Sequence, residues 1–185
     1  CAKVSALSYD HQLFSADAAG LRVLEGTEAG VETVFVEHRG NTVSSMEEAE
    51  AIIRLVREHL GMLWSPGAGK PARPLAAADI LVVAAYNAQV NLVREVLEAE
   101  GLSAVRVGTV DKFQGQEAPV VLVTMACSSA ADASRGIEFL LNRNRINVAI
   151  SRGQWKAVIV RSERLTDYLP SNPSTLSQLG AFMAL

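Results

Sequence analysis

Residues 119–126 read Pro-Val-Val-Leu-Val-Thr-Met-Ala, and this nearly uninterrupted apolar run is the stretch that decides the fold. A strand of a parallel sheet is covered on both faces and is therefore apolar throughout, whereas a half-exposed strand alternates with polar residues. Residues 79–84, Asp-Ile-Leu-Val-Val-Ala, show the same continuous apolar pattern. Together the two runs predict buried strands of a parallel sheet.

Strand and helix patterns alternate on either side of these runs. Residues 31–37 alternate with a period of two, as in a strand with one buried face. Further strands are expected over 104–109 and 155–160, and helices over 44–60, 87–100 and 144–152. Such alternation is typical of an open α/β sheet with helices on both faces. Ligands of these sheets sit at the carboxyl ends of the strands, so we expect the functional residues just after strands.

The first of these helices has marked ends. Ser45 followed three residues later by Glu48 matches a capping box, and Gly61 stands where a C-terminal cap belongs. His59, near the helix end, is interpreted as a partner of the helix dipole, because the histidines have no metal-ligand spacing. The Gly- and Pro-rich residues 61–78 are expected to be a surface loop.

Length and composition describe one globular domain: 185 residues, 49% hydrophobic and 20% charged. Two cysteines, Cys1 and Cys127, cannot build a disulfide framework or a zinc site alone, so we expect a reducing, cytoplasmic location. No apolar run approaches the roughly 18 residues of a membrane span, and no membrane partner is expected. The first residue is not Met, which we interpret as a sign that the chain is a piece of a longer polypeptide.

The net charge of −3 hides an asymmetry along the chain. Residues 1–100 carry 8 Lys or Arg against 14 Asp or Glu, whereas residues 101–185 carry 9 against 6. Local positive charge in an acidic protein suggests a site for a polyanion, either phosphate or nucleic acid. The alternative is a solvated basic face without a ligand.

Residues 65–70, Ser-Pro-Gly-Ala-Gly-Lys, superficially resemble a phosphate-binding loop. A Walker A motif needs Gly and Ser or Thr where this sequence has Trp64 and Pro71. In addition, no apolar strand ends in an Asp-Glu pair that could hold Mg²⁺. We therefore expect neither a metal site nor a complete NTPase within this chain.

Residues 108–117, Gly-Thr-Val-Asp-Lys-Phe-Gln-Gly-Gln-Glu, crowd polar groups between two expected strands. Asp111 either caps the short helical turn that follows or takes part in binding, and Phe113 is expected to be a core anchor. The groups available for binding are the Thr109 hydroxyl, the heads of Gln114, Gln116 and Glu117, and the backbone at Gly115.

Residues 141–153, Leu-Asn-Arg-Asn-Arg-Ile-Asn-Val-Ala-Ile-Ser-Arg-Gly, form the third informative segment. In a helix Ile146 and Ile150 pack inward, while Arg145 and Arg152 share another face two turns apart. Arg152, at the expected helix end, either complements the helix dipole or offers its planar fork to a phosphate.

Three segments in this order resemble motifs IV, V and VI of superfamily 1B helicases. They are Ala85-Tyr-Asn-Ala-Gln-Val90, Val107-Gly-Thr-Val-Asp-Lys-Phe-Gln-Gly-Gln-Glu117 and Arg145-Ile-Asn-Val-Ala-Ile-Ser-Arg152. The nearest group includes the nonsense-mediated-decay RNA helicase and the replication nuclease-helicases, and the resemblance runs from about residue 30 to 161. Where the family has Pro before the Tyr of motif IV, this chain has Ala85, which leaves that turn less rigid.

The resemblance implies a C-terminal RecA-like domain, an α/β three-layer sandwich with a mostly parallel sheet. Residues 1–185 would form the second RecA-like domain, with 1–30 as a linker from the first domain and 170–185 as a C-terminal tail. ATP and Mg²⁺ would be bound mainly by the first RecA-like domain, which is one expected partner. Single-stranded nucleic acid is the other, with DNA favoured over RNA.

Carried over by position, Arg152 would be the arginine finger on the γ-phosphate of ATP. Glu117 would contact the nucleotide, with Gln114 and Gly115 shaping the turn. Arg145 could touch the nucleotide, pair with Glu117 or support the helix.

The same resemblance implies a nucleic-acid track along Tyr86, Asn87, Gln89 and Thr109, which would hold phosphates without reading sequence. The resulting hypothesis is an ATP-dependent helicase half that is inactive in isolation. The alternatives are a non-catalytic RecA-like binding or assembly module and an unrelated nucleotide-binding α/β protein; the latter lacks a phosphate loop here.

Overall fold

The computed structural model describes residues 21–67 and 69–185, and its centre is a five-stranded parallel sheet. The strand order is β2-β8-β7-β5-β6, and every neighbouring pair runs parallel. The strands are β2 (Gly30–Phe35), β5 (Ile80–Ala84), β6 (Arg106–Gly108), β7 (Ala118–Thr124) and β8 (Gly153–Arg161). Every residue of β5 and β7 is buried, which confirms the prediction made from their continuous apolar sequences.

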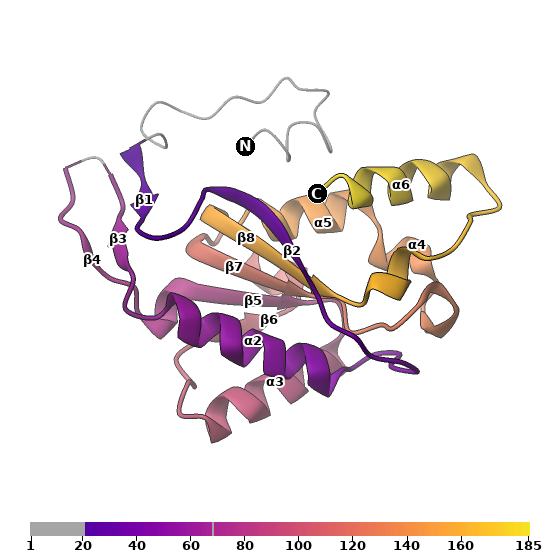
Figure 1. The fold of residues 1–185 in the computed structure, drawn as a ribbon, viewed down its shortest axis with the longest axis horizontal. Helices are drawn as coiled ribbons and strands as arrows, with labels where there is room; N and C mark the ends of the chain where they lie inside the picture. Colours follow the sequence, from indigo (N-terminus) through magenta and orange to yellow (C-terminus); the bar gives the residue numbers. More distant parts are fainter. Residues whose placement is uncertain (1–20, 68) are drawn as a thin grey trace.

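Helices cover both faces of this sheet, so the predicted α/β three-layer, RecA-like architecture is confirmed (Figure 1). On one face lie α2 (Met46–His59) and α3 (Asn87–Ala99); on the other lie α4 (Ile137–Leu140), α5 (Arg143–Ile150) and α6 (Pro173–Met183). Alternate residues of a strand serve the two layers: Leu122 packs toward α2 and α3, and Val121 toward α5. Short 3₁₀ turns complete the elements: η2 (Ala77–Asp79), η3 (Val110–Phe113), η4 (Ala130–Asp132) and η5 (Glu163–Thr166).

Residues 61–78 differ from the surface loop that their composition predicts. They contain β3 (Leu63–Ser65) and β4 (Arg73–Pro74), which form a small antiparallel sheet with β1 (Val23–Leu24). Burial of Trp64 and Leu24, which both join the core on the α2 side, explains why β3 forms here despite the nearby glycines and prolines. Of the expected linker, residues 1–20 lie outside the described residues.

The ends of α2 agree with only part of their sequence signals. Ser45 is the N-cap and its Oγ accepts the Glu48 backbone N–H at 3.1 Å, and Gly61 takes the expected left-handed conformation with φ of +80°. The other half of the capping box is absent, because the Glu48 side chain turns into the core. His59 is buried and its Nδ1 lies 2.7 Å from the Leu55 carbonyl oxygen, inside the last turn of the helix.

Arg161, at the carboxyl end of β8, joins α6 to the sheet. Its side chain is buried, with the guanidinium carbon 4.7 Å from the centre of the Phe35 ring and 5.3 Å from that of Phe182. Nη1 donates hydrogen bonds to the Ser162 carbonyl and the Thr166 hydroxyl. Burial lowers the pKa of Arg161. Most of residues 170–185, expected only as a C-terminal tail, form α6 and are thereby held on the sheet.

None of the helices in the described part of the chain combines the length and apolar character needed to cross a bilayer.

A bidentate salt bridge joins β4 to η2, and its effect on stability can be tested. Arg73 donates two hydrogen bonds to Asp79, at 2.6 and 2.7 Å, and Asp79 also accepts the Ala76 N–H at 2.9 Å. The hydrogen bonds from Arg73 hold the pKa of Asp79 below its usual 3.8, although partial burial opposes this. We expect Asp79→Asn to lower the free energy of unfolding by about 1 kcal/mol at pH 7.

Because the folded-state pKa is depressed, this stabilisation is present above the unfolded pKa and is lost as pH falls through the folded one. Urea unfolding of the wild type and the Asp79→Asn variant, at pH values from 7 down to about 2.5, measures this loss of stability. A difference between the two proteins that stayed constant down to the lowest pH would contradict the assignment.

Candidate functional site

The expected site residues lie at two opposite edges of the sheet. Tyr86 and Thr109 follow the carboxyl ends of β5 and β6, as expected. Glu117 and Arg152 instead come directly before β7 and β8, at the amino edge, so the expectation that functional residues follow strands is wrong for these two. Arg145 lies at the carboxyl edge with Tyr86, because α5 runs antiparallel to the strands and Arg145 is in its first turn.

Arg152 and Glu117 are brought together at the amino edge by a backbone hydrogen bond. The N–H of Ala118, next to Glu117, donates to the Arg152 carbonyl at 3.0 Å. The Arg152 guanidinium is half-buried; its Nε donates to the Val148 carbonyl and its Nη2 to the Ser151 hydroxyl, both at 3.0 Å. These bonds give the Val148 carbonyl oxygen, in the last turn of α5, a hydrogen-bond donor. They also fix the orientation of the Arg152 guanidinium. Among the described residues Arg152 has no carboxylate partner, so its charge is free to meet an anion.

Two further side chains, Gln154 and Arg106, make hydrogen bonds at the amino edge and were not predicted from the sequence. Gln154 Nε2 donates to Glu117 Oε2 at 3.2 Å. Arg106, the first residue of β6, donates to the Ala78 carbonyl at 3.0 Å and to Gln116 Oε1 at 3.4 Å. The signal available in the sequence was weak, because Arg106 lies inside the expected strand 104–109 and Gln154 just before the expected strand 155–160. Nothing local shows that these two strands meet near Glu117.

The turn before β7 exposes the backbone that the sequence analysis singled out. Gln114 and Gly115 are exposed, and Gly115 has φ of +78°, a conformation that side-chain-bearing residues rarely adopt. Phe113 is buried, which confirms it as a core anchor. Asp111 is exposed and makes no side-chain cap to η3; only its carbonyl accepts an N–H, from Gln114.

At the carboxyl edge the expected track residues differ in exposure. Asn87, the first residue of α3, is exposed, and Thr109 is partly exposed. Tyr86 is buried, with its ring centre 5.6 Å from that of Phe139. Burial raises the pKa of Tyr86, against a smaller opposing effect of Ser134.

Gln89 has no exposed surface, and its amide is used inside the protein. Its Oε1 accepts the Ser45 N–H at 2.7 Å, while Nε2 donates to the Ser45 carbonyl at 3.2 Å and to Thr124 Oγ1 at 3.0 Å. The side chain therefore joins α3 to the start of α2 and to the end of β7.

Next to Gln89 lies a buried polar network centred on Glu48. The Glu48 carboxyl group accepts the Thr124 hydroxyl at 2.5 Å and the Ala126 N–H at 2.9 Å, and its Oε1 lies 3.0 Å from His38 Nε2. His38 Nδ1 in turn lies 2.7 Å from Ser128 Oγ. Glu48 was expected only as part of a capping box and the other four residues of the network were missed, since their contacts join positions up to 90 residues apart.

The Ser128–His38–Glu48 order is that of a hydrolase triad, but its environment excludes nucleophilic catalysis. Ser128 is 1% exposed, and its Oγ accepts the Asn41 backbone N–H at 2.9 Å. A substrate could not reach this oxygen without unfolding the loops around it. The network is therefore structural, and it also holds Ala126 at φ of +64°, an unusual value for a residue other than Gly.

The fold and the two edges define a RecA-like α/β domain. A family model described as an AAA domain (AAA_12) matches residues 14–164, and the chain belongs to that family.

Curated relatives are longer proteins. The chain is 42% identical over 99 residues to the DNA polymerase alpha-associated DNA helicase A of Schizosaccharomyces pombe, a match covering 54% of this chain and 13% of the relative. It is 32% identical over 127 residues to the DNA replication ATP-dependent helicase/nuclease DNA2 of Mus musculus, covering 69% and 10%. The matches thus cover about a tenth of the length of these relatives.

A solved C-terminal domain of a possible DNA helicase from Lactobacillus plantarum WCFS1 is similar with a TM-score of 0.48 and 13% identity. That match covers 89% of this chain and 84% of the other.

The Glu48 network generates a second prediction. Replacing Glu48 with Ala leaves the Thr124 hydroxyl, the Ala126 N–H and His38 without their shared acceptor, so we expect unfolding to become easier by about 3 kcal/mol. The matched control is Glu50→Ala, an exposed carboxylate two residues along the same helix, which should change stability by less than about 0.5 kcal/mol. Urea unfolding measures both. Equal effects of the two substitutions would show that the network does not stabilise the fold.

Proposed function

We propose that this chain is the C-terminal RecA-like motor domain of an ATP-dependent nucleic-acid helicase or translocase. The observation that carries the proposal is the position of Arg152 beside Glu117 at the amino edge, held by the backbone hydrogen bond from Ala118 to Arg152. The Arg152 guanidinium is oriented by α5 and has no carboxylate partner among the described residues. Membership of the AAA domain family and relatives named as helicases support the same reading.

In this proposal Arg152 is the arginine finger for ATP bound mainly by a first RecA-like domain. A guanidinium held by two hydrogen bonds on one side keeps its remaining N–H groups for phosphate oxygens. Such a group stabilises the charge that develops as the γ-phosphoryl group is transferred, and Mg²⁺ supplies further charge neutralisation when bound. Glu117, steadied by Gln154, would contact the nucleotide, and Gln114 and Gly115 would form the exposed turn beside it.

The nucleic-acid track in this proposal lies at the opposite edge. Asn87 and Thr109 have exposed polar groups there, at the start of α3 and after β6. Gln89 is fully buried, so we assign it no contact with nucleic acid. Its hydrogen bonds instead hold α3 in place behind the track. Since the two edges are joined by rigid strands and by α5, closure of the nucleotide site would move the track as one body.

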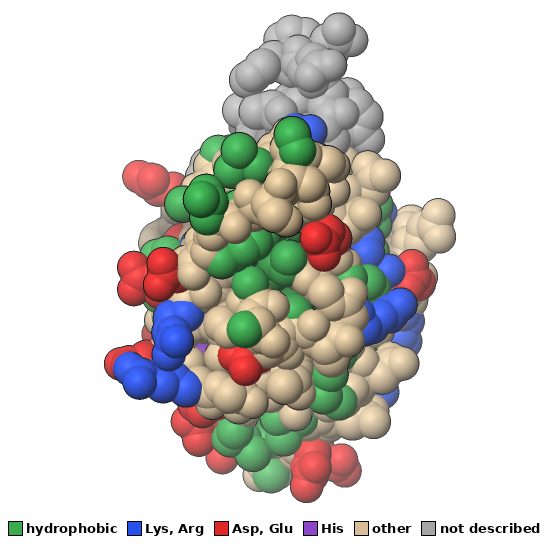
Figure 2. Space-filling model, turned by 90° about the vertical axis from the view of Figure 1, so that its right-hand side faces the viewer, with side chains coloured by type: hydrophobic (Ala, Val, Ile, Leu, Met, Phe, Trp, Pro, Cys, Tyr) green, Lys and Arg blue, Asp and Glu red, His purple; other side chains and the backbone are tan. Residues whose placement is uncertain are grey.

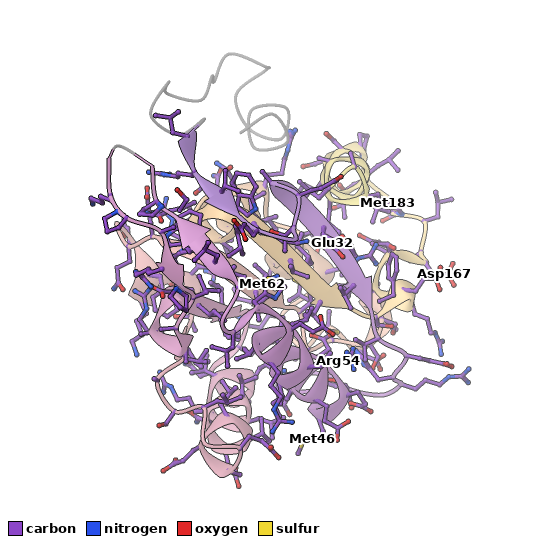
Figure 3. The ribbon with its side chains drawn as sticks, turned by 60° about the vertical axis from the view of Figure 1, so that its left-hand side comes forward. Glu32, Met46, Arg54, Met62, Asp167 and Met183 are labelled. Atoms are coloured by element: carbon purple, nitrogen blue, oxygen red, sulfur yellow. The ribbon has the colours of Figure 1, made fainter. Side chains whose placement is uncertain are left out.

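The finger assignment predicts a large kinetic effect. In the full-length polypeptide, Arg152→Gln should lower kcat of nucleic-acid-stimulated ATP hydrolysis by about 10³-fold, because the transition-state charge loses its partner. Arg54→Gln, which removes an exposed charge on α2, is the matched control and should leave kcat unchanged (Figure 3). The measurement is phosphate release with and without single-stranded nucleic acid. Unchanged hydrolysis in the Arg152 variant would overturn the finger and favour a non-catalytic module.

A second expectation concerns the 185 residues alone. Without the domain proposed to hold the phosphates and Mg²⁺, the isolated chain should release no phosphate above background from ATP in the presence of single-stranded DNA or RNA. Robust turnover by the isolated chain would contradict the proposal that it is half of a motor.

A further inference from the structure

Phe139, in α4, is the centre of a cluster of aromatic and basic side chains at the carboxyl edge of the sheet. The guanidinium carbon of Arg135 lies 3.9 Å from the centre of the Phe139 ring, and that of Arg145 lies 4.6 Å from it. The ring of Tyr86 packs against Phe139 as well. The two arginines come from separate segments, the loop after η4 and the first turn of α5, so the fold has brought two cations to one ring.

Neither guanidinium has an ion pair or a side-chain hydrogen bond within the described part of the chain. The two neighbouring carboxylates have other partners: Asp132 accepts the Ser129 hydroxyl at 2.6 Å, and Glu138 accepts the Thr175 hydroxyl at 3.2 Å. Two cations less than about 9 Å apart repel each other, and cation–π contacts of about 1 kcal/mol only partly offset that repulsion. An anion bound between them would relieve it.

The cluster borders the residues proposed for the nucleic-acid track. Arg145 and Phe139 line a small hollow together with Val110, which follows the proposed track residue Thr109, and Ala85, which lies two residues before Asn87. The carboxyl ends of the strands point to the right in Figure 1, so this edge faces the viewer in Figure 2. Lys and Arg side chains lie on both flanks of that face, with acidic side chains near them, and the area between the flanks is mostly hydrophobic and other side chains with some Asp and Glu (Figure 2).

We propose that Arg135 and Arg145, supported on the Phe139 ring, bind backbone phosphates of single-stranded nucleic acid. This inference rests on the proposed function and extends its track by two residues that carry charge. Stacking on the ring restricts each guanidinium before binding, so less side-chain freedom is lost when the phosphate is held. The contact is to phosphate and therefore does not read sequence.

The inference also removes Arg145 from the nucleotide site. Arg145 and Arg152 lie at opposite ends of α5, about two turns or 10 Å apart along its axis, and only Arg152 is next to Glu117. Pairing of Arg145 with Glu117, one of the alternatives raised by the sequence, is not found; Glu117 accepts Gln154 instead.

The test is binding of fluorescein-labelled oligo(dT) and oligo(U) to the full-length polypeptide without ATP, followed by anisotropy over a series of salt concentrations. Arg135→Gln combined with Arg145→Gln should weaken binding of both strands at least tenfold and lower the slope of log K against log salt by about 1 to 2. Arg135→Gln alone, at an exposed position, should give part of the effect and guards against a folding defect at Arg145. Arg54→Gln, the same charge change on the far layer, should change neither quantity (Figure 3).

The outcomes separate this inference from the proposed function. One outcome is that the double variant binds oligo(dT) and oligo(U) as the wild type does, while Arg152→Gln still abolishes stimulated hydrolysis. That result would contradict the phosphate contact and leave the proposed motor function supported. An increase in KM for ATP with unchanged strand affinity would likewise overturn the inference and return Arg145 to the nucleotide. If the wild type binds no single strand at all, the proposed function fails together with it.

Discussion

The loops at the carboxyl edge of the sheet depend on the hydrogen bonds made by one buried group, the carboxyl group of Glu48. It accepts hydrogen bonds from the end of β7 and from the strained backbone at Ala126, and it contacts His38 from the loop before α2. Through Thr124 it is linked to Gln89 and so to α3. A buried carboxyl group is tolerated only when its acceptor positions are filled, and here the end of β7 and the loop before α2 supply three partners. The loops that carry the proposed nucleic-acid track are thereby held against a fixed point.

The parallel strands and the antiparallel helix α5 place the proposed nucleotide site and the proposed nucleic-acid track at opposite edges of the sheet. The strands carry Glu117 and Thr109 to opposite edges, and α5 has Arg145 at one end and Arg152 at the other. Arg145 lies in the first turn of α5 and Arg152 directly follows its C-cap, Ser151, while Ile146 and Ile150 of the same helix are packed in the core. In the proposed motor, a displacement of the nucleotide edge would therefore be transmitted to the other edge through a rigid element rather than through a loop.

Much of the fold was predictable because its signals are local. The continuous apolar runs of β5 and β7, the cap at Ser45 and the glycine after α2 depend on residues close together in the chain, and all are found. The small sheet β1-β3-β4 was not predicted, because pairing between Val23 and Ser65 outweighs the loop composition of the intervening sequence. Glu48 was misread for a related reason: its spacing fits a capping box, but its partners Thr124 and Ala126 lie far along the chain.

The amino-acid sequence by itself determined the layer architecture and the candidate functional segments, since strand burial, helix caps and motif spacing are properties of neighbouring residues. Only the tertiary structure decided which of those segments meet. It placed Arg152 next to Glu117 through the backbone hydrogen bond from Ala118, placed Arg145 at the other edge beside Phe139 and buried Gln89. The physical reason is that strand order and helix direction, which no local pattern encodes, set the edge at which each side chain emerges.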